Sequence, residues 1–168
     1  MKKIIIKILS AVFLLFVAIQ FIHTEKNVST TVSANDISKQ YAVPAAVDTI
    51  LAKACYDCHS NNTRYPWYNN FQPVSWWLGG HIKDGKRHLN FNEFTNMRIA
   101  RQYKRLNDCI ETVKENEMPL QSYTWIHKNA ILTDAEKETL FNWCNAVRDS
   151  MKARYPADSL VMPKKKSS

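Results

Sequence analysis

Two cysteines three positions apart, followed directly by a histidine, constrain this chain more than any other feature: Cys55-Tyr56-Asp57-Cys58-His59. On a helix, positions i, i+3 and i+4 share one face, so Cys55, Cys58 and His59 can converge on one flat ligand. This spacing is the attachment signature of c-type haem, in which both thiols bond to the porphyrin and the imidazole binds iron. The motif therefore predicts a haem attached through Cys55 and Cys58, with His59 as its proximal iron ligand.

Three other interpretations of the cysteine pair compete with haem. A thioredoxin-like redox motif needs a βαβ context, which the sequence does not show. A zinc site needs further ligands, but no second CxxC and no HxxxH pattern follows. A structural disulfide between Cys55 and Cys58 is the simplest alternative. The directly adjacent histidine separates haem from all three.

The composition indicates one compact and mainly helical domain. Only three glycines occur among 168 residues, all between positions 79 and 85, and sheet-rich folds with many tight turns need more. Long alternations of valine, isoleucine and threonine are also absent. We expect an all-α fold, a small cytochrome c-like helical domain over residues 41–155, behind an N-terminal signal-anchor helix.

Residues 1–24 have the features of a signal anchor or a signal peptide. Met1-Lys2-Lys3 precedes an apolar run from Ile4 to Ile22, which approaches the ~20 residues of a membrane span. No small-x-small cleavage site follows closely, so we expect a retained single-pass anchor in the cell inner membrane. The early lysines would stay in the cytoplasm, with the haem domain in the periplasm. Cleavage would instead release the domain into the periplasm.

Polar segments are expected on both sides of the domain. Residues 25–40 are rich in serine, threonine and asparagine and predict a flexible linker. Residues 156–168 include three successive lysines and predict a disordered basic tail. Lysines near the two ends account for six of the eight excess positive charges, so the remaining charge does not by itself indicate nucleic acid.

Hydrophobic spacing predicts four helices within the domain. We expect them over residues 41–54, from near Pro73, over residues 92–116, and from Thr133 onward. Thr133 and Glu136 form a capping box, which marks the start of the last helix. This last helix is expected to pack against the first.

An aromatic cluster without a regular period lies between residues 65 and 78. Its rings are either ordinary core residues or, for several of them, a lining of the porphyrin edge that keeps water from the iron. The residues expected to contact haem are Tyr65, Trp67 and Trp77. Arg64 nearby either pairs with a haem propionate or is solvated.

Met118, in the segment Glu117-Met118-Pro119-Leu120, is the expected sixth iron ligand. It follows His59 by 59 residues, and its soft thioether would favour reduced iron and raise the reduction potential. The alternative is that Met118 only fills space in a loop or in the core. His127 and His81 are rival ligands, because either could supply a second imidazole.

Two further sets of residues leave alternatives open. Cys109 and Cys144 each fall within a predicted helix, and they either form a helix-to-helix disulfide or stay separate buried thiols. Seven basic residues between positions 83 and 105 form either a solvated face or a docking patch for an acidic redox partner.

Taken together, these residues resemble the bacterial haem-binding domain family, which is defined by a CxxCH motif in secreted or membrane-tethered proteins. The resemblance spans residues 41–148 and is carried by Cys55–His59, Ser60–Thr63, Tyr65–Tyr68, Pro73–Trp77, His81-Ile82, Leu89–Phe91, Glu117–Leu120 and Tyr123. It implies a haem domain of a kind sometimes found beside cytochrome c and peroxidase-like domains. It implies no catalytic residues.

We therefore expect a protein that binds one haem c and carries single electrons in the periplasm. The alternative is a haem peroxidase, or a ligand-sensing haem domain with an open sixth iron position. The expected partners are a redox protein and the membrane, without nucleic acid. The sequence contains no second CxxCH, so a chain of several haems is not expected.

Overall fold

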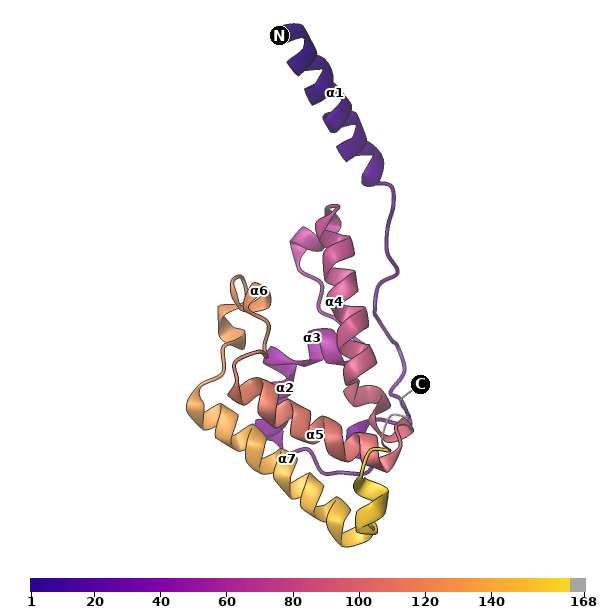
Figure 1. The fold of residues 1–168 in the computed structure, drawn as a ribbon, viewed down its shortest axis with the longest axis vertical. Coiled ribbons are helices and arrows are strands. Elements are labelled where there is room, and N and C mark those ends of the chain that lie inside the picture. The colour runs from indigo at the N-terminus through magenta and orange to yellow at the C-terminus, as the bar shows by residue number, and fades with distance from the viewer. Residues whose placement is uncertain (164–168) are drawn as a thin grey trace.

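The computed structural model describes residues 1–163, and within this range every regular element is helical, which confirms the all-α class (Figure 1). The α-helices are α1 (Lys2–Ile19), α2 (Ala45–Ala54), α3 (Tyr56–His59), α4 (Val74–His88), α5 (Ile99–Lys114), α6 (Gln121–Thr124) and α7 (Asp134–Arg154). Short 3-10 helices are η1 (Ile37–Lys39), η2 (Trp67–Asn70), η3 (Phe91–Asn96), η4 (Lys128–Ala130) and η5 (Ala157–Leu160).

The core of the domain lies between α2, α5 and α7. Helix α5 packs along α7, and α2 also contacts α7, as expected of the first and last helices of the domain (Figure 1). Leu51, Leu106 and Leu140 come from these three helices and are fully excluded from solvent. Burying a leucine contributes about 2 kcal/mol, so these contacts position α2 and the cysteine motif that follows it.

The local signals for helix starts are mostly realised. At α7, Thr133 N donates to Glu136 Oε2 at 2.8 Å and Glu136 N donates to Thr133 Oγ1 at 3.3 Å, which completes the predicted capping box. Helix α5 begins at Ile99 rather than near residue 92. The reason is that Phe91 and Phe94 are buried by the separate 3-10 helix η3.

Residues 27–40, expected within a flexible linker, lie along the domain. The Asn27 side-chain amide donates to Ser60 O at 2.9 Å and to Thr63 Oγ1 at 3.0 Å. Further on, Ile37 in η1 is buried in the hydrophobic core. Paired polar groups and a buried isoleucine fix this segment, so the packed domain begins before residue 41.

The expected tail also begins later than residue 156. Residues 157–160 form η5, which packs against α5, and Leu160 is buried in the core. Burial of this leucine makes the segment part of the domain. Residues 164–168, with the terminal lysines of the expected disordered tail, lie outside the described residues.

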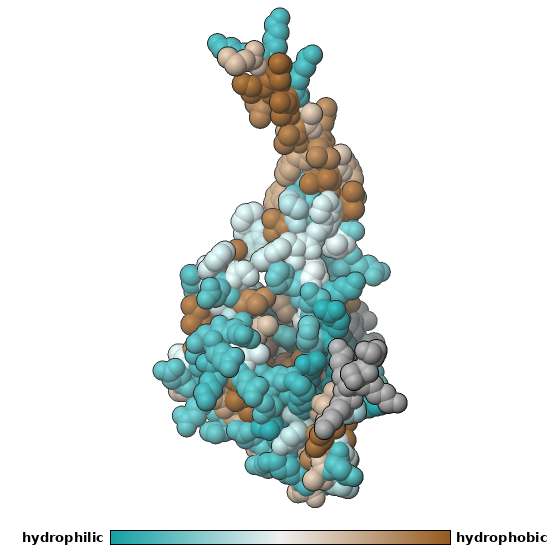
Figure 2. All heavy atoms as spheres, in the orientation of Figure 1, coloured by the Kyte–Doolittle hydropathy of each residue, from teal (hydrophilic) through white to brown (hydrophobic). Residues whose placement is uncertain are grey.

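Helix α1 projects from the domain, with no side chain buried (Figure 1). Its surface is predominantly apolar, as the brown side chains in Figure 2 show. Among residues 1–163, no helix is both long enough and apolar enough to cross a lipid bilayer. The anchor expected of residues 1–24 stays a prediction.

Candidate haem site

The cysteine motif forms a single helical turn directly after α2. Cys58 N and His59 N both donate to Cys55 O, at 3.1 Å and 2.9 Å. This turn aligns the three side chains as a shared helix face requires, and all three line one cleft. The structure therefore brings together the three residues predicted to hold haem.

The thiols of this turn differ from those of a redox-active CxxC pair. Burial raises the pKa of Cys55 well above its ordinary value and raises the pKa of Cys58 to about 11. A thioredoxin-like pair depends on a cysteine whose pKa is lowered. The environment of Cys55 and Cys58 therefore disfavours the dithiol-exchange interpretation.

The imidazole of His59 has one nitrogen engaged by the backbone. Its Nδ1 lies 2.8 Å from Leu89 O. A carbonyl oxygen can only accept, so we assign the proton to Nδ1, which leaves the Nε2 lone pair free for a metal. Burial lowers the pKa of His59, against the opposing effect of backbone hydrogen bonds to Leu89 and Gly85, and favours the neutral ring that binds metals.

Gly85 allows α4 to lie directly against the cysteine motif. A Cβ atom at this position would be 2.6 Å from Cys58 O and 3.1 Å from Cys58 Cβ, so any side chain there would force the two helices apart. His81 and His88 also line the cleft and lie four residues before and three residues after Gly85, on the same face of α4.

Met118 reaches the cleft because the chain reverses after α5. Asn116 adopts a left-handed backbone conformation with φ of 59°, as residues after helix ends often do. Glu117 N and Met118 N then donate to Thr112 O at 2.8 Å and 3.1 Å. This turn places Met118 in the lining of the cleft that also contains His59.

The cleft consists of two adjoining cavities of about 450 Å³ and 300 Å³. Both are lined by Ala54, Cys55, His59, His88, Met118 and Pro119. Leu89, Phe91 and Leu132 complete the apolar walls of the larger cavity. Apolar walls with a few convergent polar groups are typical of cofactor sites.

Arg105 supplies a test of whether this cleft fits haem. Its Nη1 donates to Asp108 Oδ2 at 2.8 Å, but its buried Nε has no hydrogen-bond partner. Buried polar groups nearly always have partners, and a guanidinium N–H pairs well with a carboxylate. The two thiols, the free imidazole nitrogen, the apolar walls and this unpaired donor together fit haem and one of its propionates.

The aromatic residues predicted to contact haem are not in the lining of this cleft. Tyr65 Oη instead accepts a hydrogen bond from Asn27 N at 2.7 Å, and Trp67 and Trp77 are 75% and 50% exposed. They belong to the segment that enters α4, whereas the cleft lies near Gly85 at the other end of that helix. The aromatic rings in the lining are those of Phe91 and Tyr123.

The predicted rivals of Met118 have different surroundings. His127 is outside the cleft lining, its Nε2 is 2.9 Å from Tyr68 Oη, and its ring stacks on Tyr123. His81 does line the cleft, and its Nδ1 is 2.9 Å from Trp77 O. His88, which lies in a polar stretch of the sequence and was not predicted as a ligand, also lines the cleft, and its spacing of two helical turns from His81 is a signal that could have found it.

Arg64 is engaged away from any propionate. Its Nε donates to Asp57 Oδ1 at 3.0 Å, and its backbone N donates to the same oxygen at 3.1 Å. Asp57 is buried between the two cysteines of the motif. Arg64 therefore stabilises the motif by pairing with its buried carboxylate.

Cys109 and Cys144 meet between α5 and α7, and all four cysteines are free thiols. A hydrogen bond between the two side chains lowers the pKa of Cys109 and raises that of Cys144. The two thiols are therefore neighbours, but a disulfide between them stays a prediction.

These features define a class of protein: an all-helical domain in which one CxxCH turn opens into an apolar cleft. The haem-binding domain family model matches residues 14–146, and the chain belongs to this family. No curated protein and no solved structure gives a significant match. The family match confirms the resemblance seen in the sequence and identifies a haem-binding protein.

Proposed function

We propose that this protein carries single electrons through one covalently attached c-type haem. Cys55 and Cys58 hold the porphyrin, His59 Nε2 binds the iron, and Met118 takes the sixth position. The observation that carries the proposal is that these four side chains line one apolar cleft. When bound, haem supplies a reversible one-electron couple.

The surrounding residues have supporting roles. The hydrogen bond from His59 Nδ1 to Leu89 O orients the ring and makes it a stronger ligand. Leu89, Phe91 and Leu132 exclude water. Arg105 donates its unpaired Nε–H to a propionate, which compensates the cost of placing that carboxylate near an apolar wall.

An acidic redox protein is the proposed partner. A basic groove of about 740 Å³ shares His88 with the haem cleft, so charge complementarity here would bring a partner close to the haem edge. The groove includes one acid, Glu93, and five cationic residues: Lys83, Lys86, Arg87, Arg98 and Arg101.

The proposed location of the domain is the periplasmic side of the inner membrane, with α1 as its anchor. In support, α1 has exposed apolar side chains on all sides. Its charged residues, Lys2, Lys3 and Lys7, lie in the first two turns, where long side chains can reach lipid headgroups. This arrangement would leave the basic N-terminus in the cytoplasm.

The test uses the full chain produced with a c-type haem maturation system. Haem staining of a denaturing gel should detect covalent haem, and visible spectra should show low-spin iron with a sulfur-to-iron band. Met118→Ala should abolish that band, whereas Met162→Ala should not, because Met162 lies outside the haem cleft.

Other results would contradict defined parts of the proposal. No covalent haem would overturn attachment through Cys55 and Cys58. High-spin iron that binds added ligands in the wild type would overturn the electron carrier and favour a peroxidase or sensor. A low-spin spectrum lost in His81→Ala but kept in Met118→Ala would assign the sixth position to His81.

A further inference from the structure

Residues 67–77 carry exposed apolar side chains at the end of the domain nearest α1 (Figure 1). We call the side chains of Trp67, Phe71, Val74 and Trp77 the aromatic tip. Trp67 and Phe71 contact each other edge to face, with ring centroids 6.2 Å apart. A cluster of large exposed aromatic rings indicates a surface that is covered by another phase or molecule.

The segment that carries the aromatic tip, residues 67–77, is bound to the end of α1 by hydrogen bonds in both directions. The side chain of Gln20, the C-cap of α1, donates to Gln72 O at 3.2 Å and accepts from Gln72 N at 2.9 Å. The Gln72 side chain and Trp76 Nε1 donate to Ile22 O at 2.9 Å and 3.0 Å. The first polar residue after the apolar helix therefore lies beside the aromatic tip.

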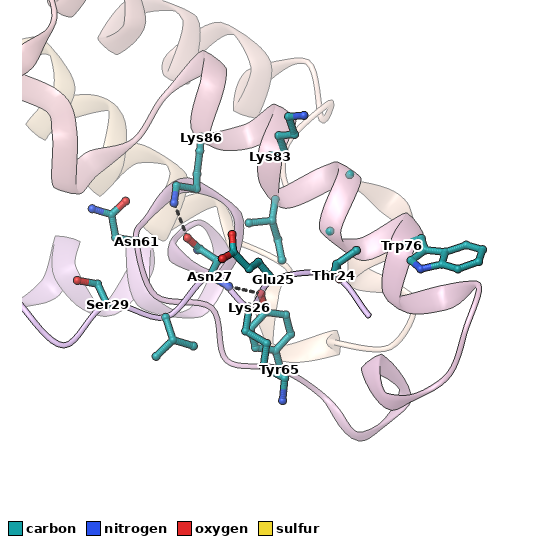
Figure 3. Close-up of a pocket in the computed structure, with 14 residues that line it drawn as sticks. Thr24, Glu25, Lys26, Asn27, Ser29, Asn61, Tyr65, Trp76, Lys83 and Lys86 are labelled. Atoms are coloured by element: carbon teal, nitrogen blue, oxygen red, sulfur yellow. Dashed lines mark hydrogen bonds between the residues drawn. The ribbon is translucent and has the colours of Figure 1, made fainter. Parts of the chain in front are cut away.

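The residues after Ile22 continue along the domain and are held to it by hydrogen bonds. Figure 3 shows them running beside α4, where Asn27 contacts both the Tyr65 hydroxyl and Lys86. Thr24 lies closer to the tip, with its Oγ1 3.4 Å from Ser75 Oγ. These contacts hold the domain in one orientation relative to α1.

We propose that the aromatic tip is a lipid-contact surface, seated among the headgroups of the membrane that receives α1. The inference rests on the proposed anchoring and adds a second point of membrane contact. Tryptophan is the residue that concentrates at the boundary between headgroups and acyl chains, because its ring is amphipathic. A surface joined to the end of an apolar helix lies at that boundary when the helix is inserted.

This placement also sets the height of the haem cleft. Gly85 lies 11 residues after Val74 along α4, a distance of about 16 Å along the helix axis. If α4 stands upright on the membrane, the cleft opens about one and a half helix diameters above the headgroups.

Photolabelling can test the surface in the full-length holoprotein. The probe is a phospholipid with a diazirine near its glycerol backbone, incorporated in phosphatidylcholine vesicles that contain the protein. We expect adducts on α1 and on Trp67, Phe71 or Trp77. Val161 provides an internal control, because it is 68% exposed but follows η5, at the end of the domain away from α1 (Figure 1).

The outcomes separate the two claims. Adducts on α1 without adducts on the aromatic tip would overturn the lipid-contact surface and leave the anchor standing. An absence of adducts on α1 would overturn both. Adducts on Val161 at the level of Trp67 would show non-specific labelling of exposed apolar side chains and would also overturn the surface.

A variant provides an independent measurement. Trp67→Ser, Phe71→Ser and Trp77→Ser combined should speed hydrogen exchange of the backbone amides of residues 67–77 in the vesicle-reconstituted holoprotein by about tenfold or more, because the apolar contact that holds them in the lipid is lost. Val161→Ser should leave the rate unchanged. Equal rates for the triple variant and the wild type would overturn the proposal. An unchanged visible spectrum verifies that the triple variant remains folded around its haem.

Discussion

The Tyr123 hydroxyl donates a 2.7 Å hydrogen bond to Asp57 Oδ2 and so joins α6 to the middle of the cysteine motif. The other Asp57 oxygen accepts from Arg64, and the carboxylate is nearly excluded from solvent. Tyr123 follows Met118 by five residues, and both line the cleft. The bond therefore holds the Met118 segment beside the two haem-attaching cysteines.

Replacing Tyr123 with phenylalanine should loosen this connection. A hydrogen bond to a buried charged group is worth about 1.5–3 kcal/mol, so we expect the free energy of unfolding of Tyr123→Phe to fall by about 2 kcal/mol. Cyanide should also bind the iron faster if Met118 is its ligand. Guanidinium unfolding and stopped-flow absorbance provide the measurements.

Tyr155→Phe is the matched control, because the Tyr155 hydroxyl makes only a 3.4 Å contact with Gln40. Its effect should be under about 1 kcal/mol. Equal losses of stability in the two variants would show that the bond between Tyr123 and Asp57 has no special importance.

The close approach of α4 to the cysteine motif predicts opposite effects for two glycines. Gly85→Ala would place Cβ 2.6 Å from Cys58 O, and overpacking of this kind costs about 1–3 kcal/mol. Its yield of covalent haem should fall too. Gly80→Ala meets no atom within 4 Å and should raise stability by up to about 1 kcal/mol, because alanine favours a helix.

Denaturant unfolding and haem staining of the two glycine variants, prepared in parallel, are the measurements. A Gly85→Ala protein as stable and as fully loaded as Gly80→Ala would contradict the tight packing of α4 on the motif.

The segment after α7 should contribute to stability through one leucine. Leu160 is 8% exposed and packs in the core, so Leu160→Ala should cost about 2–3 kcal/mol of unfolding free energy. The neighbouring Val161 is 68% exposed, and Val161→Ala should change stability by under about 0.5 kcal/mol. Thermal unfolding of both variants measures the difference. Identical melting temperatures would show that residues 157–160 belong to the disordered tail and do not stabilise the domain.

The ion pair between α2 and α7 predicts a dependence on pH. Lys53 Nζ lies 2.5 Å from Glu136 Oε1, and this contact, together with the Thr133 backbone, lowers the pKa of Glu136 below its ordinary value of 4.5. A lowered carboxyl pKa adds stability that is fully present above 4.5 and is lost as the pH falls through the folded-state pKa.

Glu136→Gln should therefore be less stable than the wild type by about 1 kcal/mol at pH 7, and this gap should close towards pH 3. Urea unfolding of the two proteins at several pH values tests the prediction. A gap that stays constant from pH 7 to pH 3 would assign the loss to capping geometry and not to the charge of Glu136.

The sequence predicted those features of the fold and the site that depend on residues close together along the chain. The capping box at Thr133, the helical class and the shared face of Cys55, Cys58 and His59 all follow from spacing along the chain. The region of Met118 could also be identified, because a methionine beside a proline lies just past a predicted helix.

Other parts of the site depend on contacts between distant segments, and no spacing rule encodes them. Gly85 is required only because α3 lies against α4, and Arg105 is notable because it lines the cleft with a buried Nε that lacks a partner. Trp67 and Trp77 are predicted to contact haem, but both rings are exposed. An aromatic run without a regular period does not indicate which of its rings face the cofactor and which face outward.

Polar composition was misleading for a related reason. Serine and asparagine in residues 25–40 suggested a flexible linker, but a polar side chain that finds a fixed partner orders the chain. Asn27 pairs with Ser60 and Thr63, which lie directly after the haem-attaching motif. Only the folded arrangement reveals those partners.

The contact between Asn27 and Ser60 has a consequence for assembly. Ser60 directly follows His59, so the N-terminal segment can take its place only where the cysteine turn has its folded shape. A chain whose cysteine turn is misfolded would leave residues 27–29 open to proteases, whereas the folded domain would resist cleavage there.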